Sequence, residues 1–352
     1  MTPRLPLLAA VCRAALAAAA LLLAAAPGPA AVPAEPAPPA DNQDGPPSTR
    51  DERIVLRPGQ ADLDAWRLPA NYRKPDGSFD QAAIVAHEKE RLPVLNQRLG
   101  ARLRIAETTH YLLFTDADAP TADKFAAWSE ALYANLGRQF GIPADERIWD
   151  GKCILMLFAT RAMFESHARA FDGFGAPGVR KAGAYFAWEA RPEGQPQLVH
   201  ICIPLDTRDE RRLQELFAHE GTHAFFQLYK RPVDLPRWLH EGLAEYMTVV
   251  NDPALRPRKL EWSRAIARSR QSIRDVLASA PDDTFAYPAY SVSYTLVDFL
   301  LAAGRDKFKK FVERLKTGAD QDAALREAYG FDLAELQRRW YLYVNEYVSA
   351  QR

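Results

Sequence analysis

The chain has 352 residues, enough for one large domain or two of modest size. Hydrophobic residues make up 48% of it and charged residues 26%, and both values are ordinary for a soluble globular protein. Lys and Arg together number 45 and so do Asp and Glu, so no overall charge points to a nucleic-acid partner.

The N-terminus has the pattern of a secretory signal. Arg4 and Arg13 supply positive charge, an apolar run of small residues and leucines extends from Ala14 to Ala26, and small-x-small sites follow. We therefore predict a signal peptide over residues 1–31, cleaved on export to the periplasm or the extracellular space, with no stable membrane insertion afterwards. A retained anchor is the alternative, although the run is shorter than the roughly 20 residues that a spanning helix needs.

The rest of the chain divides by composition. Residues 32–50 are dense in Pro and Ala and predict a flexible or polyproline-like linker. Residues 51–100 predict an N-terminal extension with loops and a helical stretch that ends near Gly100. The main domain is predicted over residues 101–350. Its three parts are a sheet-containing part, a pair of active-site helices and a helical part, over residues 101–208, 209–250 and 251–350.

The sheet-containing part alternates predicted strands with helices. Strand patterns occur in ARLRIAETTHYLLFT, CILMLFAT, AGAYFAWEA and QLVHICIPL, and the last two form a predicted hairpin. Helices are predicted from Pro120 to Gly137 or Gly141, in RAMFESHARAF, and after a cap at Asp206 or Thr207. Beyond that cap the pattern is helical almost to the end. The predicted fold class is α+β, with a small mixed β-sheet in the N-terminal half and an all-helical C-terminal half.

Two cysteines remain once the predicted signal is removed. Cys153 and Cys202 both lie in strand-like runs, so neighbouring strands can bring them together. Two cysteines in an exported chain can pair, which makes a disulfide possible. Two buried free thiols are the alternative, and the sequence does not decide between them.

A predicted helix in the middle of the chain carries a metal-binding pattern. His219 and His223 are four residues apart in LFAHEGTHAFFQLY, so they lie on one helix face and can reach one metal ion. Glu220 projects about 100° away from His219, where it can hydrogen-bond a water without binding the metal. H-E-x-x-H on a helix is the pattern of zinc proteases, with the glutamate as general base. The apolar flanks predict burial, which is costly for these side chains without a metal.

The third ligand decides the class of zinc site. A histidine at position 229 would complete a metzincin site, and Tyr229 stands there instead. Carboxylates in the next predicted helix are the remaining donors, and Glu241 and Glu245 lie one turn apart in it. Two imidazoles and one carboxylate form the ligand set of a catalytic zinc with an open position.

The two segments together resemble the gluzincin zinc metallopeptidases. That family pairs H-E-x-x-H with a downstream W-L-x-E-G-x-A-x-Y, and this chain carries the matching run WLHEGLAEY from Trp238 to Tyr246. The resemblance implies that Glu241 is the third ligand and that one Zn²⁺ binds per chain. The secreted peptidase-MA-like domains of bacteria are also similar, over roughly residues 100–350 by their order of elements.

Further roles follow from this resemblance. Ligand histidines usually donate their second ring nitrogen to a carboxylate, and Glu245 fits that role towards His219. A Tyr or His of the C-terminal part commonly stabilises the oxyanion in gluzincins. We predict Tyr290 for this role by its place in the family-like Y-x-x-S-x-x-L-V pattern. Tyr294 and Tyr287 are close to it in sequence, and aromatic core packing is the alternative for each tyrosine.

One position departs from the family pattern. Aminopeptidase-type members carry Asn beside the ligand glutamate, whereas this chain has His240, and it also lacks their Gly-x-Met-Glu-Asn run. The resemblance therefore does not imply specificity for a free N-terminus. His240 is expected either to line the cleft or to be exposed.

A basic segment follows the two motifs. Residues 256–279 predict an amphipathic helix with Trp262, Ile266, Ile273 and Leu277 on one face. Its basic residues predict a solvated face, or else a surface for an acidic substrate or an anionic envelope polymer. They are Arg256, Arg258, Lys259, Arg264, Arg268, Arg270 and Arg274. Four other histidines stand alone in the sequence and are expected to be structural or exposed: His87, His110, His167 and His200.

The predicted function is that of an exported zinc-dependent metallopeptidase. A metal-activated water would hydrolyse the peptide bond, with Glu220 as the general base. The expected partner is a peptide or protein substrate, bound by strand addition near Trp188, and no nucleic acid. Two alternatives are a non-catalytic module that binds the cell envelope and a zinc hydrolase of a non-peptide amide. A fourth protein ligand, such as His240, would favour the non-catalytic module.

Overall fold

The computed structural model describes residues 72–173, 180, 182–189, 196–230, 233–279 and 285–348. The predicted signal peptide and linker lie outside the described residues, as do the start of the predicted extension and the turn of the predicted hairpin. Among the described helices, none combines the length and apolar character that a membrane-spanning segment requires.

A five-stranded mixed sheet forms the centre of the N-terminal half. Its strands are β1 (Arg104–Glu107), β2 (Tyr111–Thr115), β3 (Cys153–Phe158), β4 (Tyr185–Glu189) and β5 (Leu198–Pro204). Their order across the sheet is β1-β2-β3-β5-β4. The three inner strands are parallel, whereas β1 and β4 pair antiparallel at the two edges. All five strands fall within the predicted runs.

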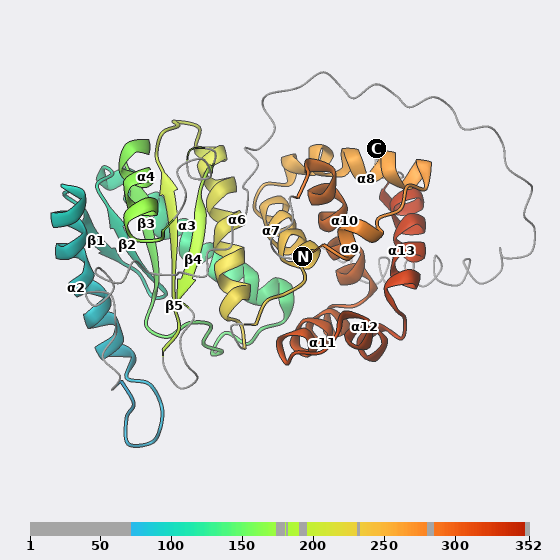
Figure 1. Ribbon diagram of the computed structural model, residues 1–352, viewed down its shortest axis with the longest axis horizontal. Coiled ribbons are helices and arrows are strands. Elements are labelled where there is room, and N and C mark those ends of the chain that lie inside the picture. Colours follow the sequence, from blue (N-terminus) through green and yellow to red (C-terminus); the bar gives the residue numbers. More distant parts are fainter. Residues whose placement is uncertain are drawn as a thin grey trace, which may run out of the picture.

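Helices cover both faces of the sheet (Figure 1). On one face lie α2 (Gln81–Leu99) and α4 (Arg161–Ala170), and on the other α3 (Ala119–Phe140) and α6 (Glu210–Leu228). Side chains along a strand point alternately to the two faces, and here both faces are apolar. The inner strands are therefore buried on both sides. Because α2 packs on this layer, the folded unit begins before residue 101.

The two cysteines are free and buried. Cys202 pairs in register with Met156, three residues along β3 from Cys153. The cysteines also point to opposite faces, since Cys153 belongs to the core beneath α3 and α6 and Cys202 to the core beneath α2 and α4. The structure thus corrects the possible disulfide: sheet register and alternation separate the two sulfur atoms, and the free-thiol alternative holds.

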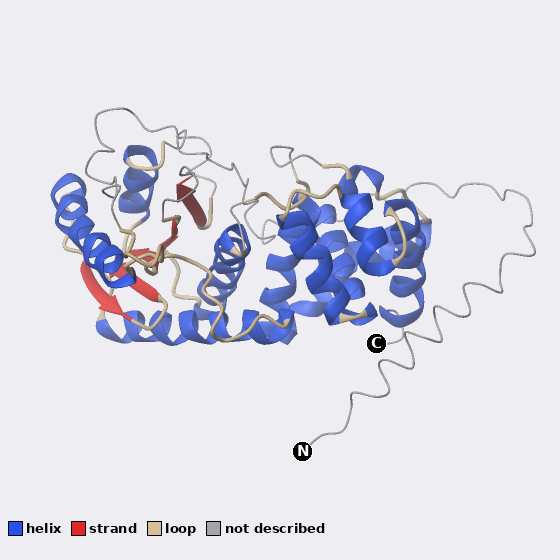
Figure 2. Cartoon of the chain, turned by 90° about the horizontal axis from the view of Figure 1, so that it is seen from below, coloured by secondary structure: helices blue, strands red, loops and turns tan. Residues whose placement is uncertain are grey.

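The C-terminal half is helical, as Figure 2 shows by the confinement of the strands to the other half. Its helices are α7 (Arg237–Asn251), α8 (Arg256–Ser269), α9 (Arg274–Leu277), α10 (Tyr287–Ala303), α11 (Arg305–Lys316), α12 (Gln321–Tyr329) and α13 (Leu333–Leu342). A 3₁₀ segment, Pro253–Leu255, lies between α7 and α8, and a π-helical segment, Tyr343–Val348, follows α13. The predicted α+β class is confirmed, and α6 and α7 lie where the two halves meet (Figure 1).

The predicted start of the histidine helix is wrong by two to three residues. Asp209, rather than Asp206 or Thr207, is the N-cap of α6. Its carboxylate accepts hydrogen bonds from the backbone N–H groups of Arg211 and Arg212. A cap is chosen by which side chain reaches the free N–H groups of the first turn, and Asp209 does so.

The predicted helix over residues 256–279 is also wrong. It divides into α8 and α9, because Arg270 takes a left-handed conformation (φ 53°). The backbone N–H of Arg270 donates to the carbonyl of Ala267 and so ends α8. Trp262 and Ile266 are only half-buried. The face of α8 that packs inward instead contains Lys259, Leu260, Ser263 and Ala267.

A glycine on α7 lets α10 come close. A Cβ atom at Gly242 would lie 2.4 Å from the backbone carbonyl oxygen of Ser293 and 2.7 Å from Val297 Cγ2. A Cβ atom at Gly221 on α6 would instead meet the end of a flexible side chain, Leu132 Cδ2, at 2.6 Å. Gly242 therefore sets the position of α7, which carries two of the predicted site residues.

These two glycines form a matched pair for a stability test. Gly242→Ala should lower the free energy of unfolding by about 1 to 3 kcal/mol, because helix backbone cannot yield as a side chain does. Gly221→Ala should cost less, since the leucine can move and alanine gains about 1 kcal/mol in helix propensity. Urea denaturation of both variants measures the difference. Equal stability of the two variants would contradict this packing.

Candidate active site

The helix that carries the two histidines is buried over most of its length. From Leu216 to Leu228 every residue of α6 is buried, because the helix lies between the sheet and the helical half. Thr222 is tolerated there since its hydroxyl donates to the carbonyl of Ala218 at 2.6 Å. A helix in this position presents one face to the sheet and another to α7, which approaches from the C-terminal half.

Three side chains on α6 and α7 converge on one point. His219 Nε2 and His223 Nε2 lie 3.1 Å apart, and Glu241 Oε2 lies 3.5 Å from each of them. These three side chains offer ligand atoms that all lie within 4.8 Å of one another. All three residues are buried. The structure thus brings together the three predicted metal ligands.

The donor set fits a zinc ion. Four ligands at about 2.0 to 2.1 Å in a tetrahedron stand roughly 3.3 to 3.4 Å apart, close to the separations between these three atoms. Glu241 is 1% exposed, and in the described part of the chain the nitrogens nearest to its oxygens lie at 3.5 Å, beyond ordinary hydrogen-bond length. A buried carboxylate without close donors is costly, and a cation among the three atoms removes that cost.

A second group of metal-type side chains lies beneath α4, on the other face of the sheet. His167 Nδ1 lies 3.3 Å from Asp172 Oδ2 and 3.7 Å from Cys202 Sγ, and His200 Nε2 lies 3.1 Å from the same Asp172 oxygen. His167 and His200 thus have structural roles in this group, which is one of the two outcomes predicted for them. Tyr185 donates to Asp172 Oδ2 at 2.6 Å.

The two groups differ in how their carboxylates are satisfied. Asp172 accepts hydrogen bonds from a tyrosine and has two imidazoles within 3.3 Å, and these contacts hold the pKa of its carboxyl far below the usual value in spite of burial. The group beneath α4 is therefore closed by its own hydrogen bonds. Among the described residues, the nitrogens nearest to the Glu241 carboxylate belong to His219, His223 and Arg237 and lie farther away, at 3.5 Å, so the group on α6 and α7 is the better candidate for a metal site.

Glu220 lies beside His219 and His223, the predicted ligand histidines, and is 2% exposed. Burial raises the pKa of its carboxyl, while the neighbouring imidazoles of His219 and His223 partly oppose that effect. The backbone N–H of Phe186, on the edge strand β4, donates to this carboxylate. A carboxyl with a raised pKa exchanges a proton more readily near neutral pH, which suits a general base.

Glu245 lies on the outer side of His219. Its Oε1 atom is 3.2 Å from His219 Nδ1, whereas the other ring nitrogen, Nε2, faces His223 and Glu241. Burial raises the pKa of Glu245, but Lys259 and His219 outweigh burial and bring it to about 2. The structure therefore brings an ionised Glu245 to the position predicted for it, one turn after Glu241.

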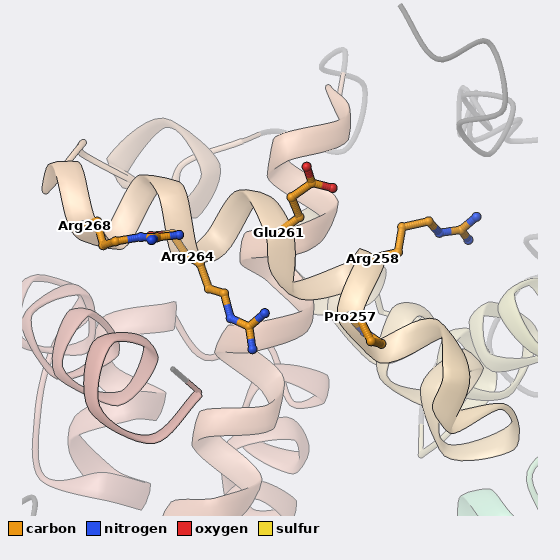
Figure 3. A pocket seen from close by; sticks show the side chains of 5 residues that line it. All are labelled: Pro257, Arg258, Glu261, Arg264 and Arg268. Atoms are coloured by element: carbon orange, nitrogen blue, oxygen red, sulfur yellow. The ribbon is translucent and has the colours of Figure 1, made fainter. Parts of the chain in front are cut away.

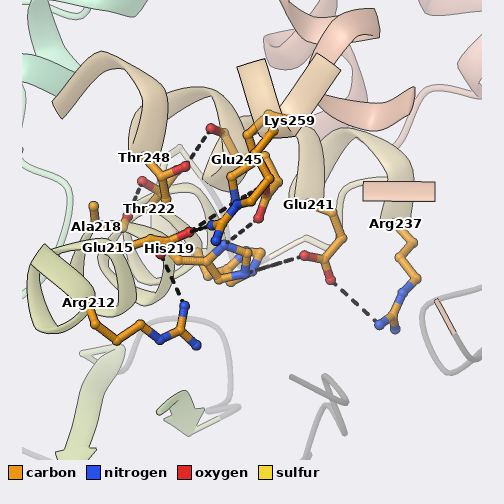
Figure 4. A network of polar contacts seen from close by, with 12 residues as sticks. Arg212, Glu215, Ala218, His219, Thr222, Arg237, Glu241, Glu245, Thr248 and Lys259 are labelled. Carbon is orange, nitrogen blue, oxygen red and sulfur yellow. Dashed lines mark hydrogen bonds and ion pairs between the residues drawn. The ribbon is translucent and has the colours of Figure 1, made fainter. Parts of the chain in front are cut away.

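Arg237 approaches Glu241, the predicted third ligand, from the start of α7. Its guanidinium NH2 lies 3.5 Å from Glu241 Oε1, and its Cζ atom lies 5.1 Å from the centre of the Phe285 ring. Figure 4 shows Arg237 beyond Glu241 and Lys259 beside Glu245 and Glu215. Burial raises the pKa of the Glu241 carboxyl, but the imidazoles of His219 and His223 outweigh burial and hold it well below the usual value.

The three candidate tyrosines occupy different surroundings on α10. Tyr290 is buried, and its ring packs edge-to-face with the Phe285 ring, with 5.0 Å between the ring centroids. The Arg237 guanidinium lies over the same Phe285 ring. Tyr294 packs on Tyr246 instead and interacts with Arg256. Tyr287 lies within electrostatic range of Lys259 and Glu245. The three tyrosines share one face of α10 by helical spacing, and their neighbours differ along it: Phe285 for Tyr290, Lys259 and Glu245 for Tyr287, and Tyr246 and Arg256 for Tyr294.

Three further predicted residues can now be placed. His240 is buried rather than exposed: its ring lies 4.2 Å from that of His223, and its Nε2 is 3.4 Å from the backbone oxygen of His223. It is not among the converging ligand atoms of the described residues. Trp188 lies on β4, the edge strand. Tyr229 ends α6 and its hydroxyl lies 3.0 Å from Glu313 Oε1, so its side chain is tied to α11.

The basic run of α8 has two sides. Its outer side forms a shallow groove lined by Pro257, Arg258, Glu261, Arg264 and Arg268 (Figure 3). Its inner side carries Lys259, which is 3% exposed and pairs with glutamates of α6 and α7. The prediction of a solvated face is therefore wrong for Lys259. No periodicity in the sequence distinguishes this lysine from the arginines around it.

A family model matches the part of the chain that carries these residues. Residues 197–346 match the model of the Peptidase MA superfamily. The matched span runs from the start of β5 to the end of the helical half, so it includes His219, His223 and Glu241. No curated protein matches the chain. Members of the Peptidase MA superfamily are typically metallopeptidases, so the match supports a metallopeptidase-type domain over residues 197–346.

Proposed function

We propose that this protein is an exported zinc-dependent metallopeptidase of the gluzincin type. The observation that carries the proposal is the convergence of His219, His223 and Glu241 beside a buried Glu220. The two Nε2 atoms and the Glu241 carboxylate would hold one Zn²⁺. When bound, the ion supplies a Lewis acid that polarises the scissile carbonyl and lowers the pKa of water to roughly 7. Export rests on the signal pattern of residues 1–31.

The chain's own residues supply the remaining chemistry. Glu220 accepts a proton from the attacking water and passes it to the nitrogen of the leaving amine, a transfer that its raised pKa favours. Tyr290 donates a hydrogen bond to the carbonyl oxygen of the substrate as that oxygen gains negative charge. Glu245 keeps the His219 ring oriented by accepting from Nδ1.

The substrate would bind along β4. This strand is an edge of the sheet, and the N–H of Phe186 within it donates to Glu220. A peptide added to such an edge gains backbone hydrogen bonds that do not depend on its side chains. The scissile bond of an extended peptide would then lie beside the general base.

Removal of metal tests this function. A chelator should abolish cleavage of a mixture of unfolded proteins, and one equivalent of Zn²⁺ per chain should restore it, because three protein ligands define one open zinc site. Mass spectrometry of the new N-termini measures cleavage, and elemental analysis counts the metal. The Glu220→Gln variant, purified in the same way, controls for contaminating proteases. Cleavage that survives complete removal of the metal would overturn the proposal.

A further inference from the structure

A buried lysine from α8 reaches between two glutamates next to the metal-ligand residues. Lys259 is 3% exposed. Its Nζ contacts Glu245 Oε2 on α7 and lies 3.2 Å from Glu215 Oε1 on α6 (Figure 4). Its backbone carbonyl accepts a hydrogen bond from Ser291 Oγ of α10 at 2.6 Å. One residue thus links α8 to three other helices.

The contact with Glu245 leads directly to a ligand. One oxygen of Glu245 faces Lys259, and the other lies 3.2 Å from His219 Nδ1. Glu245 is 5% exposed, so water cannot readily take the place of either partner. A movement of the Glu245 carboxylate would therefore turn the His219 ring, whose other nitrogen faces His223 and Glu241.

The charges near the two glutamates are distributed unequally. Glu215 has two more cations, Arg258 at 2.7 Å and Arg212 at 3.1 Å. For Glu245, Lys259 is the only Lys or Arg within ion-pair distance in the described part of the chain. Loss of Lys259 would leave Glu215 paired and Glu245 as a buried anion beside an imidazole. The Glu245 carboxylate would then move from its present position, since an uncompensated buried charge is strongly unfavourable.

From this geometry we infer that Lys259 is a positioning residue for the metal site, acting through Glu245 on His219. The inference rests on the proposed function, because it assigns His219 Nε2 to a zinc ion. Lys259 keeps the Glu245 carboxylate directed at Nδ1. The Nδ1 proton then stays on the outer side of the ring, and the Nε2 lone pair faces the metal.

The test measures zinc affinity directly, by competition of the purified protein with a chromogenic chelator. Lys259→Met should bind zinc about 10- to 100-fold more weakly, the usual loss when the outer partner of a ligand is disturbed. Lys259→Arg keeps the charge and should lie closer to wild type. Lys316→Met is the matched control, because Lys316 is also a buried lysine of the helical half and donates to the backbone carbonyls of Gln227 and Val233. It should lose stability without losing zinc affinity.

A double-mutant cycle tests the route through Glu245. Lys259→Met should weaken zinc binding in the wild-type background but add little in the Glu245→Gln background, since the two act as one unit. The double variant also removes both charges together, which proteins often tolerate when one lone buried charge is not. The zinc affinity of the double variant can therefore be measured even where Lys259→Met alone does not fold.

The outcomes distinguish failure of this inference from failure of the proposed function. Wild-type protein that binds no zinc would overturn both. Wild-type protein that binds zinc and cleaves peptides, with an unchanged affinity in Lys259→Met, would overturn the role of Lys259 alone. Additive losses in the double variant would contradict the route through Glu245, and an equal loss in Lys316→Met would mean a merely structural effect.

Discussion

Glutamine in place of Glu220 should lower peptide hydrolysis by about 100- to 10,000-fold while zinc remains bound, the range expected for loss of a general base. The amide has nearly the same size as the carboxyl and still accepts the hydrogen bond from the Phe186 N–H. It cannot take a proton from water. Burial of Glu220 and its place beside both histidines make this the most direct effect on chemistry that the site allows.

The measurement pairs turnover with metal content. Initial rates on a cleaved peptide give the loss in kcat, and elemental analysis should find about one zinc in both proteins. Glu210→Gln is a suitable control, because Glu210 lies in the exposed first turn of the same helix and pairs with Lys124. It should leave the rate unchanged. A Glu220→Gln variant as active as wild type would remove Glu220 from the mechanism.

Loss of the third ligand should have the largest effect on metal binding. Glu241→Gln keeps the volume of the side chain but removes the charge between the two imidazoles, so zinc affinity should fall by more than about 100-fold, beyond the loss for an outer partner. Zinc stabilises only the folded state, in which α6 and α7 bring the ligands together. Added zinc should therefore raise the Tm of wild type and leave that of Glu241→Gln unchanged.

The group beneath α4 provides the matched control for this experiment. Cys202→Ser alters a buried residue of the other candidate group, next to His167. Because hydrogen bonds already satisfy Asp172, this variant should keep the metal content and the zinc-dependent rise in Tm of wild type. A loss of one zinc in Cys202→Ser, with none in Glu241→Gln, would reverse the assignment of the two groups.

Features that depend on residues close together in the sequence could be predicted from the sequence. The spacing of His219 and His223 places both on one face of a helix in whatever surroundings that helix lies. Alternating and apolar runs predicted the strands and most helices, because burial repeats with the period of each element. The errors lie where one side chain or one backbone angle decides, as at the Asp209 cap and at Arg270, which ends α8.

The site shows the same division. By itself the sequence determined that two imidazoles and a glutamate lie together on α6, and that two carboxylates one turn apart follow on the next helix. Glu241 and Glu245 are equivalent by helical period, and only the packing of α7 against α6 directs the first to the Nε2 atoms and the second to Nδ1. Tertiary structure likewise brought Lys259 to Glu245 and kept Cys153 from Cys202. Local periodicity determines the face of a helix or strand on which a side chain lies. The residue that this side chain contacts depends on how elements distant in the sequence pack.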